Sequence, residues 1–305
     1  MSRKYSNFIR HPLKLVFSWG MRGHLKFLND RNYIKLMYWC KFGKKLKLDA
    51  PKTFNEKLQW LKIYDRKPEL VGLVDKYKVK EYISEIIGEQ YIIPTLGVWN
   101  NFKEINFNKL PNQFVLKCTH DSGGVVFCKD KSKFDFKIAK KIIEQSLRRN
   151  YYWIGREWPY KNVPPRIIAE PFMVDESGIE LKDYKIFNFH GEPKIIQVDF
   201  DRFACHRRNL YDTNWNYIPA EILYPTDANV KIPKPECLDE LLMLAKKLSK
   251  RFIHVRTDFY IINEKIYFGE LTFLHGAGYE PFRPEKLGEL MGEWLKLPIE
   301  DNYGT

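Results

Sequence analysis

The chain has 305 residues, of which 44% are hydrophobic and 15% aromatic, so it can bury a full core and is not an intrinsically disordered protein. Its formal net charge is +13. Residues 1–50 hold twelve Lys and Arg against Asp30 and Asp49, so +10 of that charge lies there. The five cysteines are scattered without a C-x-x-C pair, which argues against a disulfide framework or a zinc site and favours a reducing cytoplasm.

The basic N-terminal segment, residues 1–50, is also rich in aromatic and aliphatic residues. Basic and aromatic residues together suit an anionic membrane surface or a nucleic acid. Helices packed on the protein body with a solvated basic face give the same pattern. Four charged residues interrupt the apolar runs, so no stretch reaches membrane-spanning length: Lys14, Arg22, Lys26 and Arg31. The start lacks a clean hydrophobic region and a small-residue cleavage site, so we expect no signal peptide.

Residues 53–88 are predicted to be largely helical. Thr53 and Glu56 have the spacing of a capping box, and apolar residues follow at helical spacing. Residues 74–87 are predicted to form a second helix that ends at Gly88.

Residues 114–128, FVLKCTHDSGGVVFC, are predicted to be two strands around a polar loop that contains Ser122, Gly123 and Gly124. Glycines let backbone N–H groups approach an anion closely, and Lys117 before the loop would neutralise phosphate charge. The loop is not a Walker A loop, because GxxxxGK[ST] is missing and a strand follows. Taken alone, an ordinary hairpin with a short polar loop explains the pattern better.

A helix over residues 134–149, started by Asp135, and a strand over residues 166–174 come next. The apolar part of that strand ends at Glu170, and Pro171 then removes a backbone donor. Backbone groups after such a strand can read an adenine edge, although many edge strands have the same pattern.

Residues 184–189 and 194–200 are predicted to form a hairpin that turns at residues 190–193. Basic side chains in and after it would suit a polyanion, namely Lys185, Arg202, His206 and Arg207. Asp199 and Asp201 form a D-x-D, the pattern with which many nucleotide-sugar glycosyltransferases hold their metal. So short a pattern often arises by chance, and a solvated strand end is the commoner explanation.

Residues 254–273, HVRTDFYIINEKIYFGELTF, predict a β-hairpin between two helices at residues 237–252 and 284–295. With a turn at residues 263–265, one face of the hairpin carries Arg256, Asp258, Tyr260, Phe268, Glu270 and Thr272. Asp258 then lies opposite Glu270, and such a pair destabilises a sheet unless a cation such as Mg²⁺ neutralises it. A two-residue turn would put the carboxylates on opposite faces, and an exposed hairpin with one polar face is the alternative.

Helices first and mainly antiparallel strands later predict an α+β architecture. The order of the motifs resembles that of ATP-grasp enzymes: Asp75 and Lys76, Lys117 before the glycine loop, AEPFM, then R-x-D and E-x-T. The chain is most similar to the TupA-like ATP-grasp branch, named for teichuronopeptide synthesis and frequent in surface-polysaccharide gene sets. The matching phrases are KTFNEKLQWLKIYDRKP, VLKCTHDSGG, AEPFM, LKDYKIFNFHGEPK and YFGELTF, within residues 51–284.

The resemblance implies an ATP-grasp fold of two α+β lobes that clasp ATP. The division that we expect is a basic segment at 1–50, a helical N-terminal lobe at 51–110, an ATP-binding lobe at 111–175, and a C-terminal lobe with the metal site at 176–305. ATP contacts are implied for Lys76, Lys117, Ser122, Gly123, Gly124, Glu170, Pro171, Phe172, Met173, Asp175 and Glu176. Mg²⁺ ligands are implied for Asp258 and Glu270, with Thr272 where many ATP-grasp enzymes have an asparagine ligand. The phosphoryl group or a substrate carboxylate would be held by Arg256, Lys185, Arg202 and Arg207.

The implied activity is an ATP-dependent carboxylate–amine ligase that works through an acyl phosphate. We expect a cytoplasmic enzyme that attaches an amino acid or amine to an acidic sugar or peptide in cell-surface polysaccharide or capsule biosynthesis. Residues 1–50 would attract an anionic glycan or the inner face of the cell membrane, and no nucleic acid is expected as a partner. The alternative is a metal-dependent nucleotide-sugar glycosyltransferase that uses Asp199 and Asp201. A catalytically silent binding module is disfavoured, because both lysines and both metal carboxylates are present.

Overall fold

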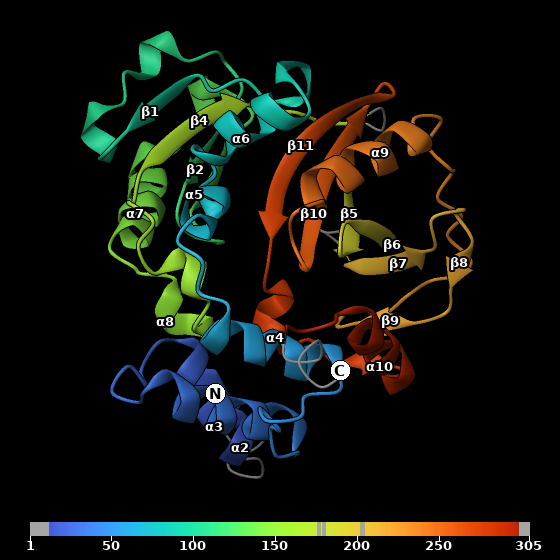
Figure 1. The fold of residues 1–305 in the computed structure, drawn as a ribbon. Coiled ribbons are helices and arrows are strands. Elements are labelled where there is room, and N and C mark those ends of the chain that lie inside the picture. Colours follow the sequence, from blue (N-terminus) through green and yellow to red (C-terminus); the bar gives the residue numbers. More distant parts are fainter. Residues whose placement is uncertain (1–11, 176–177, 179–180, 202–204, 299–305) are drawn as a thin grey trace.

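The structure is a computed structural model that describes residues 12–175, 178, 181–201 and 205–298. Figure 1 shows two β-sheets side by side, with helices around them and two N-terminal helices beneath. Neighbouring strands are antiparallel in both sheets. The predicted α+β architecture is confirmed.

The smaller sheet has four strands in the order β1 (Gly97–Trp99), β4 (Ile167–Pro171), β2 (Phe114–Cys118) and β3 (Val125–Cys128). The larger sheet has six, in the order β11 (Lys265–Thr272), β10 (His254–Ile262), β5 (Asp183–Phe189), β6 (Glu192–Phe200), β7 (Arg207–Tyr211) and β8 (Tyr217–Ile218). A short ribbon pairs β9 (Glu221–Ile222) with β12 (Phe282–Arg283).

The α-helices are α2 (Pro12–Met21), α3 (Asp30–Phe42), α4 (Phe54–Tyr64), α5 (Leu70–Val74), α6 (Val79–Ile86), α7 (Phe136–Leu147), α8 (Tyr152–Gly155), α9 (Leu238–Ser249) and α10 (Glu285–Trp294). Short 3₁₀ turns are η1 (Glu89–Tyr91), η2 (Phe102–Glu104), η3 (Phe107–Lys109), η4 (Lys131–Lys133), η5 (Trp158–Tyr160) and η6 (His275–Gly278). None of the helices in the described part of the chain has the length and apolar character needed to cross a membrane.

Two helices, α4 and α7, begin at the capping residues that the sequence predicts. Thr53 and Glu56 make the predicted capping box at α4, and Asp135 accepts two backbone N–H groups at the start of α7. The helix predicted over residues 74–87 ends before Gly88 as expected, but its start is wrong, because α6 begins at Val79. The chain leaves α5 after Val74 because the Asp75 carboxylate accepts the N–H groups of Tyr77 and Lys78, at 2.9 and 3.2 Å, and forms a local turn.

The β10–β11 hairpin differs from the predicted turn and yet keeps the predicted pair. Its turn has two residues, Asn263 and Glu264, both with positive φ, and not the three residues 263–265. One residue of β11 is then a bulge, because Asp258 pairs with Glu270 while Phe259 pairs with Phe268. The extra residue, Gly269, restores the register that the shorter turn would have lost.

Because of the bulge, Phe268 does not lie on the face where we expected it. Phe268 is opposite Phe259, with ring centroids 6.2 Å apart, and is buried on the other face from Asp258. The β5–β6 hairpin likewise turns on two residues, His190 and Gly191, where we expected four.

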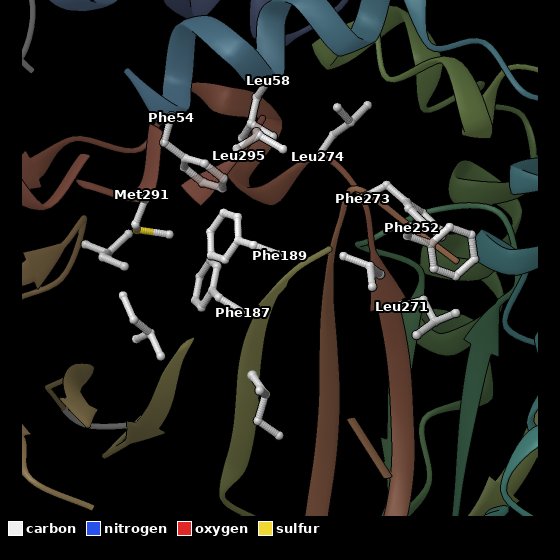
Figure 2. Close-up of a cluster of buried hydrophobic side chains, with 14 of the residues drawn as sticks. Phe54, Leu58, Phe187, Phe189, Phe252, Leu271, Phe273, Leu274, Met291 and Leu295 are labelled. Atoms are coloured by element: carbon white, nitrogen blue, oxygen red, sulfur yellow. The ribbon is translucent and has the colours of Figure 1, made fainter. Parts of the chain in front are cut away.

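The two sheets have separate hydrophobic cores. Figure 2 shows part of the larger core, where Phe54 of α4 meets Phe189 of β5 at a centroid distance of 5.8 Å and Leu295 lies close by. α3 belongs to the same core through its buried Tyr33, Ile34, Met37 and Tyr38. The smaller core lies between the four-stranded sheet and α7, and includes Phe114, Leu116 and Ile143. The two sheets are therefore the centres of two lobes.

Candidate active site

One face of the six-stranded sheet brings together Arg256, Asp258, Glu270 and other charged residues that the sequence singled out. Residues directly opposite each other in a β-ladder share a face, so the strand registers define the set. We call it the polar face: Arg256 and Asp258 on β10, Glu270 and Thr272 on β11, Asp183 and Lys185 on β5, Asp199 on β6 and Arg208 on β7.

Arg256 lies at the centre of the polar face. Its Nε and Nη2 donate to the two oxygens of Asp258, each at 2.7 Å. Nη2 also donates to Glu270 Oε1 at 3.2 Å and to Thr272 Oγ1 at 3.1 Å. The opposed carboxylates, which we expected a metal to neutralise, are thus neutralised here by a guanidinium. Burial raises the pKa of Asp258, whereas Arg256 and Lys185 keep that pKa from rising further.

Lys185 is the second cation of this face. Its ammonium lies 2.9 Å from Asp183, 3.1 Å from Asp258 and 3.7 Å from Asp199. Burial alone would lower the pKa of Lys185, but Asp183 and Asp258 outweigh it and raise the pKa above its usual value. Lys185 is therefore a fixed positive charge between three carboxylates.

The prediction for Arg207 is corrected by the register of β7. Arg207 pairs with Phe200, on the face opposite Asp199, and its guanidinium forms an ion pair with Asp227. Arg208 is the residue on the polar face, where it donates to Asp199 at 2.7 Å. Sequence reasoning missed Arg208, because only the pairing of β6 with β7 distinguishes two adjacent arginines.

Sequence reasoning also missed Glu280 and His275, which lie beyond the sheet. Arg208 lies 3.1 Å from Glu280, whose carboxylate is 2.8 Å from the buried His275. Nδ1 of that histidine in turn lies 2.5 Å from Arg256 Nη1. The chain of contacts from Asp199 therefore returns to Arg256. Arg202 and Glu176 of the predicted site lie outside the residues that the structure describes.

The four-stranded sheet holds a second charged group around Glu170. Its carboxylate accepts from Lys117 at 2.5 Å and from Lys80 at 2.6 Å. Burial raises the pKa of Glu170, but these two ammonium groups more than offset it, so the pKa lies below its usual value. Lys80 was missed, although it follows Lys76 by four residues, which is one helical turn.

The predicted glycine loop joins β2 to β3. The carboxylate of Asp121 accepts the N–H groups of Gly123 and Gly124, at 3.4 and 3.0 Å, so these groups bind an anion supplied by the loop itself. A Cβ at Gly124 would lie 2.3 Å from Ser146 Oγ and 2.7 Å from Cys118 Sγ, so only glycine fits. Ser122 and Gly123 are exposed.

Lys76 lies between the glycine loop and the polar face. The turn at Asp75 brings it to the glycine loop, where its ammonium donates to the backbone carbonyl of Asp121. Burial lowers the pKa of Lys76, and the negative charges of Glu270 and Asp121 partly raise it again. The ammonium of Lys76, in one lobe, is therefore within electrostatic reach of the Glu270 carboxylate in the other lobe.

The strip after β4 was expected to line an adenine pocket. Pro171 is paired with Phe114, the ring of Phe172 lies 6.3 Å from that of Phe127 on β3, and Met173 is half-buried. The buried Asp175, an expected ribose contact, forms an ion pair of 2.7 Å with Lys182.

The polar face suits a divalent cation in charge and in donor type. Four carboxylates face three cationic side chains, and carboxylate oxygen is the donor that Mg²⁺ prefers. The side chain of Glu270 is 44% exposed, and the hydrogen bonds that the described residues make to it use Oε1. Glu270 therefore fits a metal ligand as it stands, whereas both oxygens of Asp258 are held by Arg256.

The described residues contain no cluster of three or more His, Cys, Asp or Glu arranged to hold a metal. The D-x-D alternative gains no support, because Asp199 is 1% exposed and bound to Arg208 and Lys185.

A buried acid and base beside the turn η6 were missed as well. Lys62 of α4 donates to the carbonyl of Ala277 at 2.6 Å, and burial lowers its pKa to about 7. Burial raises the pKa of Glu157 to about 7, partly offset by Lys62 and raised further by Glu270. Glu157 precedes η5 in a loop that carried no recognisable motif.

Comparison with solved structures finds similar proteins that are distant in sequence, among them the following three. D-alanine–D-alanine ligase from Helicobacter pylori is 16% identical, over 82% of this chain and 68% of that one, with a TM-score of 0.45. N5-carboxyaminoimidazole synthetase from Staphylococcus aureus, complexed with ADP, is 16% identical over 72% and 52%, with a TM-score of 0.43. D-alanine–D-alanine ligase from Bacillus anthracis is 18% identical over 67% and 57%, with a TM-score of 0.39.

The chain thus spans little more than half the length of the last two structures. No curated protein matches it in sequence. The family model described as TupA-like ATPgrasp matches residues 56–296, which include the glycine loop, Glu170 and the whole polar face. The chain therefore belongs to the TupA-like ATP-grasp family.

Proposed function

We propose that the protein is a Mg²⁺-dependent ligase that joins a substrate carboxylate to an amine at the expense of ATP. ATP supplies the phosphoryl group that turns the carboxylate into an acyl phosphate, from which the amine displaces phosphate. The observation that carries this proposal is the polar face, where Arg256, Asp258 and Glu270 are clustered within electrostatic reach of Lys76.

Each group of residues has a distinct part in this proposal. Lys76 and Lys117 bind ATP phosphates, and the Ser122-Gly123-Gly124 loop covers them. Phosphate charge would compete with Glu170 for Lys117, which is 2.5 Å from that carboxylate here. The strip from Pro171 to Met173 lines the adenine, and Asp175 contacts the ribose.

On the polar face, Glu270 would hold Mg²⁺, and Asp258 would be a second ligand if Arg256 turned to an incoming anion; the ion would neutralise phosphate charge there. Arg256 and Lys185 then neutralise the transferring phosphoryl group or the substrate carboxylate. Phosphoryl transfer is catalysed mainly by positioning and by charge stabilisation, which such a set of side chains provides.

We propose an acidic sugar or an acidic peptide as the carboxylate substrate and an amino acid or amine as the nucleophile, in the assembly of cell-surface polysaccharide. Two features support this choice. The family takes its name from teichuronopeptide synthesis, and the polar face offers a guanidinium and an ammonium, both suited to carboxylates.

The first test is a thermal-shift comparison of nucleotides with Mg²⁺. A ligand at about 100 times its Kd stabilises a protein by about 2.7 kcal/mol, enough to measure. We expect ATP and ADP to raise the unfolding temperature of the wild type, and Glu270→Ala to reduce that shift. Glu289→Ala, an exposed glutamate on α10, is the matched control and should behave as the wild type. A shift with UDP-sugars alone, indifferent to Glu270→Ala, would refute the ATP site.

The second test measures ADP release with pairs of substrates. Uronic acids and amino acids are offered singly and together, and the ligase mechanism predicts rapid ADP release only when acid and amine are both present. ADP release that needs no carboxylate would contradict the acyl-phosphate route.

A further inference from the structure

The helix α2 and the turn after it present a surface that the ligase activity does not use. Leu15 and Trp19 of α2 are 41% and 52% exposed, and Phe27 of the turn is 77% exposed. Leu15 and Trp19 are four residues apart, so they share one side of α2, and Arg22 follows directly after the end of the helix. We call these three apolar side chains, with Lys14, Arg22 and Lys26, the α2 surface.

Exposed aromatic residues are concentrated in this part of the protein. Among the eight tryptophans of the chain, all of which the structure describes, Trp19 and Trp39 are the exposed ones, and both lie in the N-terminal helices. Other apolar side chains of these helices are buried, so the helices do pack on the hydrophobic core. α2 packs its Phe17 against Tyr279, at a centroid distance of 5.5 Å, and leaves Trp19 outside. Large apolar side chains left outside in this way mark a contact surface.

The charge around these side chains is of one sign. Lys14, Arg22 and Lys26 are all exposed, and the sequence has no acidic residue before Asp30. The Asp30 carboxylate is itself taken up by Arg66, at 2.5 Å, and by Tyr152, also at 2.5 Å. Nothing acidic on α2 or the turn after it therefore offsets the basic side chains.

We infer that the α2 surface docks the protein on an anionic lipid membrane. A bilayer interface is where tryptophan, phenylalanine and leucine gain burial while lysine and arginine contact phosphate head groups. A soluble polyanion would use the three basic residues and leave Leu15 and Phe27 in water. Figure 1 places α2 at the lower edge of the molecule, outside both sheets, so docking there leaves the polar face uncovered.

Vesicle binding by the full chain tests this inference and does not depend on the ligase activity. The probe is a set of vesicles of phosphatidylcholine with or without phosphatidylglycerol, separated by flotation. We expect binding only with phosphatidylglycerol, weakened by salt because the surface charges are screened. Each Lys or Arg near an anionic surface contributes roughly a fivefold change in affinity.

Two variants separate the apolar from the basic part. Trp19→Ser with Phe27→Ser should lose at least about tenfold in affinity, and Lys14→Gln with Arg22→Gln and Lys26→Gln about a hundredfold. The matched controls are Phe127→Ser with Ile138→Ser, whose side chains are 52% and 57% exposed on the four-stranded lobe, and a triple Gln variant at the exposed Lys133, Lys137 and Lys141. Both controls should bind as the wild type does, and unchanged unfolding temperatures would show that all variants are folded.

The inference is overturned if the wild type does not float with the anionic vesicles, or if Trp19→Ser with Phe27→Ser binds them as well as the wild type. Dextran sulfate serves as a soluble polyanion. If it binds the chain and the aromatic variant keeps that binding, while no vesicle is bound, the α2 surface is a polyanion site and not a membrane contact.

Discussion

At the scale of single residues, the polar face depends on one arginine. Arg256 bridges two carboxylates that would otherwise repel each other across the β10–β11 ladder. The same contacts hold both oxygens of Asp258. Arg256 is therefore both a structural cation and the group that must move before Asp258 can bind a metal.

Replacing Arg256 separates these two parts. Arg256→Ala removes the bidentate partner of the buried Asp258 carboxylate, which keeps Lys185 as its one described cation, and should lower the free energy of unfolding by about 3 kcal/mol. Arg256→Lys keeps the charge but not the bidentate contact, so it should cost less stability while still lowering ligase turnover about a hundredfold. Urea unfolding and ADP release measure the two effects. Equal losses of stability in both variants would contradict the argument from charge.

The buried pair Glu157 and Lys62 makes stability depend on pH. Glu157 has its pKa raised from 4.5 to about 7, so the folded protein holds a proton that the unfolded chain releases. Stability therefore falls as the pH rises from about 4.5 to about 7. The pKa of Lys62 is lowered from 10.5 to about 7, so Lys62 makes stability rise as the pH increases above about 7.

Glu157→Gln should remove the fall in the free energy of unfolding between about pH 4.5 and pH 7. Urea unfolding of both proteins across this range checks it, with the variant gaining stability relative to the wild type as the pH approaches 7. If the difference between the two proteins does not change with pH, Glu157 does not titrate as its burial implies.

At the scale of elements, a bulge decides whether Asp258 and Glu270, the two carboxylates that we propose as Mg²⁺ ligands, lie opposite each other. The two-residue turn of the β10–β11 hairpin would put Asp258 and Glu270 on opposite faces, and the extra residue Gly269 brings them together. The break between α5 and α6 has a similar consequence, because the turn at Asp75 directs Lys76 to the glycine loop. Both irregularities lie where the site is built.

Gly269→Ala tests the bulge. A Cβ there would lie 3.1 Å from the Asp258 carbonyl oxygen and 3.2 Å from Tyr260, so the hairpin must shift. We expect a loss of about 1–3 kcal/mol in the free energy of unfolding and a larger loss of ADP release than stability alone explains. Gly72→Ala is the control, because nothing lies within 4 Å of its Cβ position in α5. Full activity of Gly269→Ala would show that the register does not matter to the site.

At the scale of the whole molecule, the basic N-terminal segment is part of the folded body. Arg156, only 1% exposed, donates to the carbonyls of Leu25 and Leu28 at 3.0 Å each and lies over the ring of Tyr33 at 4.6 Å. It joins the N-terminal helices to α8. Removing residues 1–50 would therefore expose core, and point variants are the better test of that segment.

Arg156→Ala should lower the free energy of unfolding by about 3 kcal/mol, because two carbonyl oxygens and the Asp30 carboxylate lose a buried donor. Arg148→Ala, whose side chain is 80% exposed, should change it by less than about 0.5 kcal/mol. Urea unfolding measures both. A small effect at Arg156 would mean that the N-terminal helices are held by their apolar contacts alone.

From the sequence alone, the class of the fold and the family were predicted, and both are confirmed. The roles of the site residues stay predictions, although the structure brings several of these residues together on the polar face. Capping at Thr53 and Asp135, alternation in the strands and the order of the motifs are local signals, and they were read correctly because neighbours along the chain create them. The pairing of Asp258 with Glu270 was also predicted, although for a turn one residue too long.

Three features of the site became known only from the tertiary structure. Arg208, and not Arg207, faces Asp199, and Arg256 neutralises the opposed carboxylates. Lys80 and Lys117 both donate to the Glu170 carboxylate. These choices depend on strand register, on a single-residue bulge and on contacts between segments far apart in sequence. No local pattern encodes them, since a shift of one residue changes the face of every side chain in a strand while its sequence stays the same.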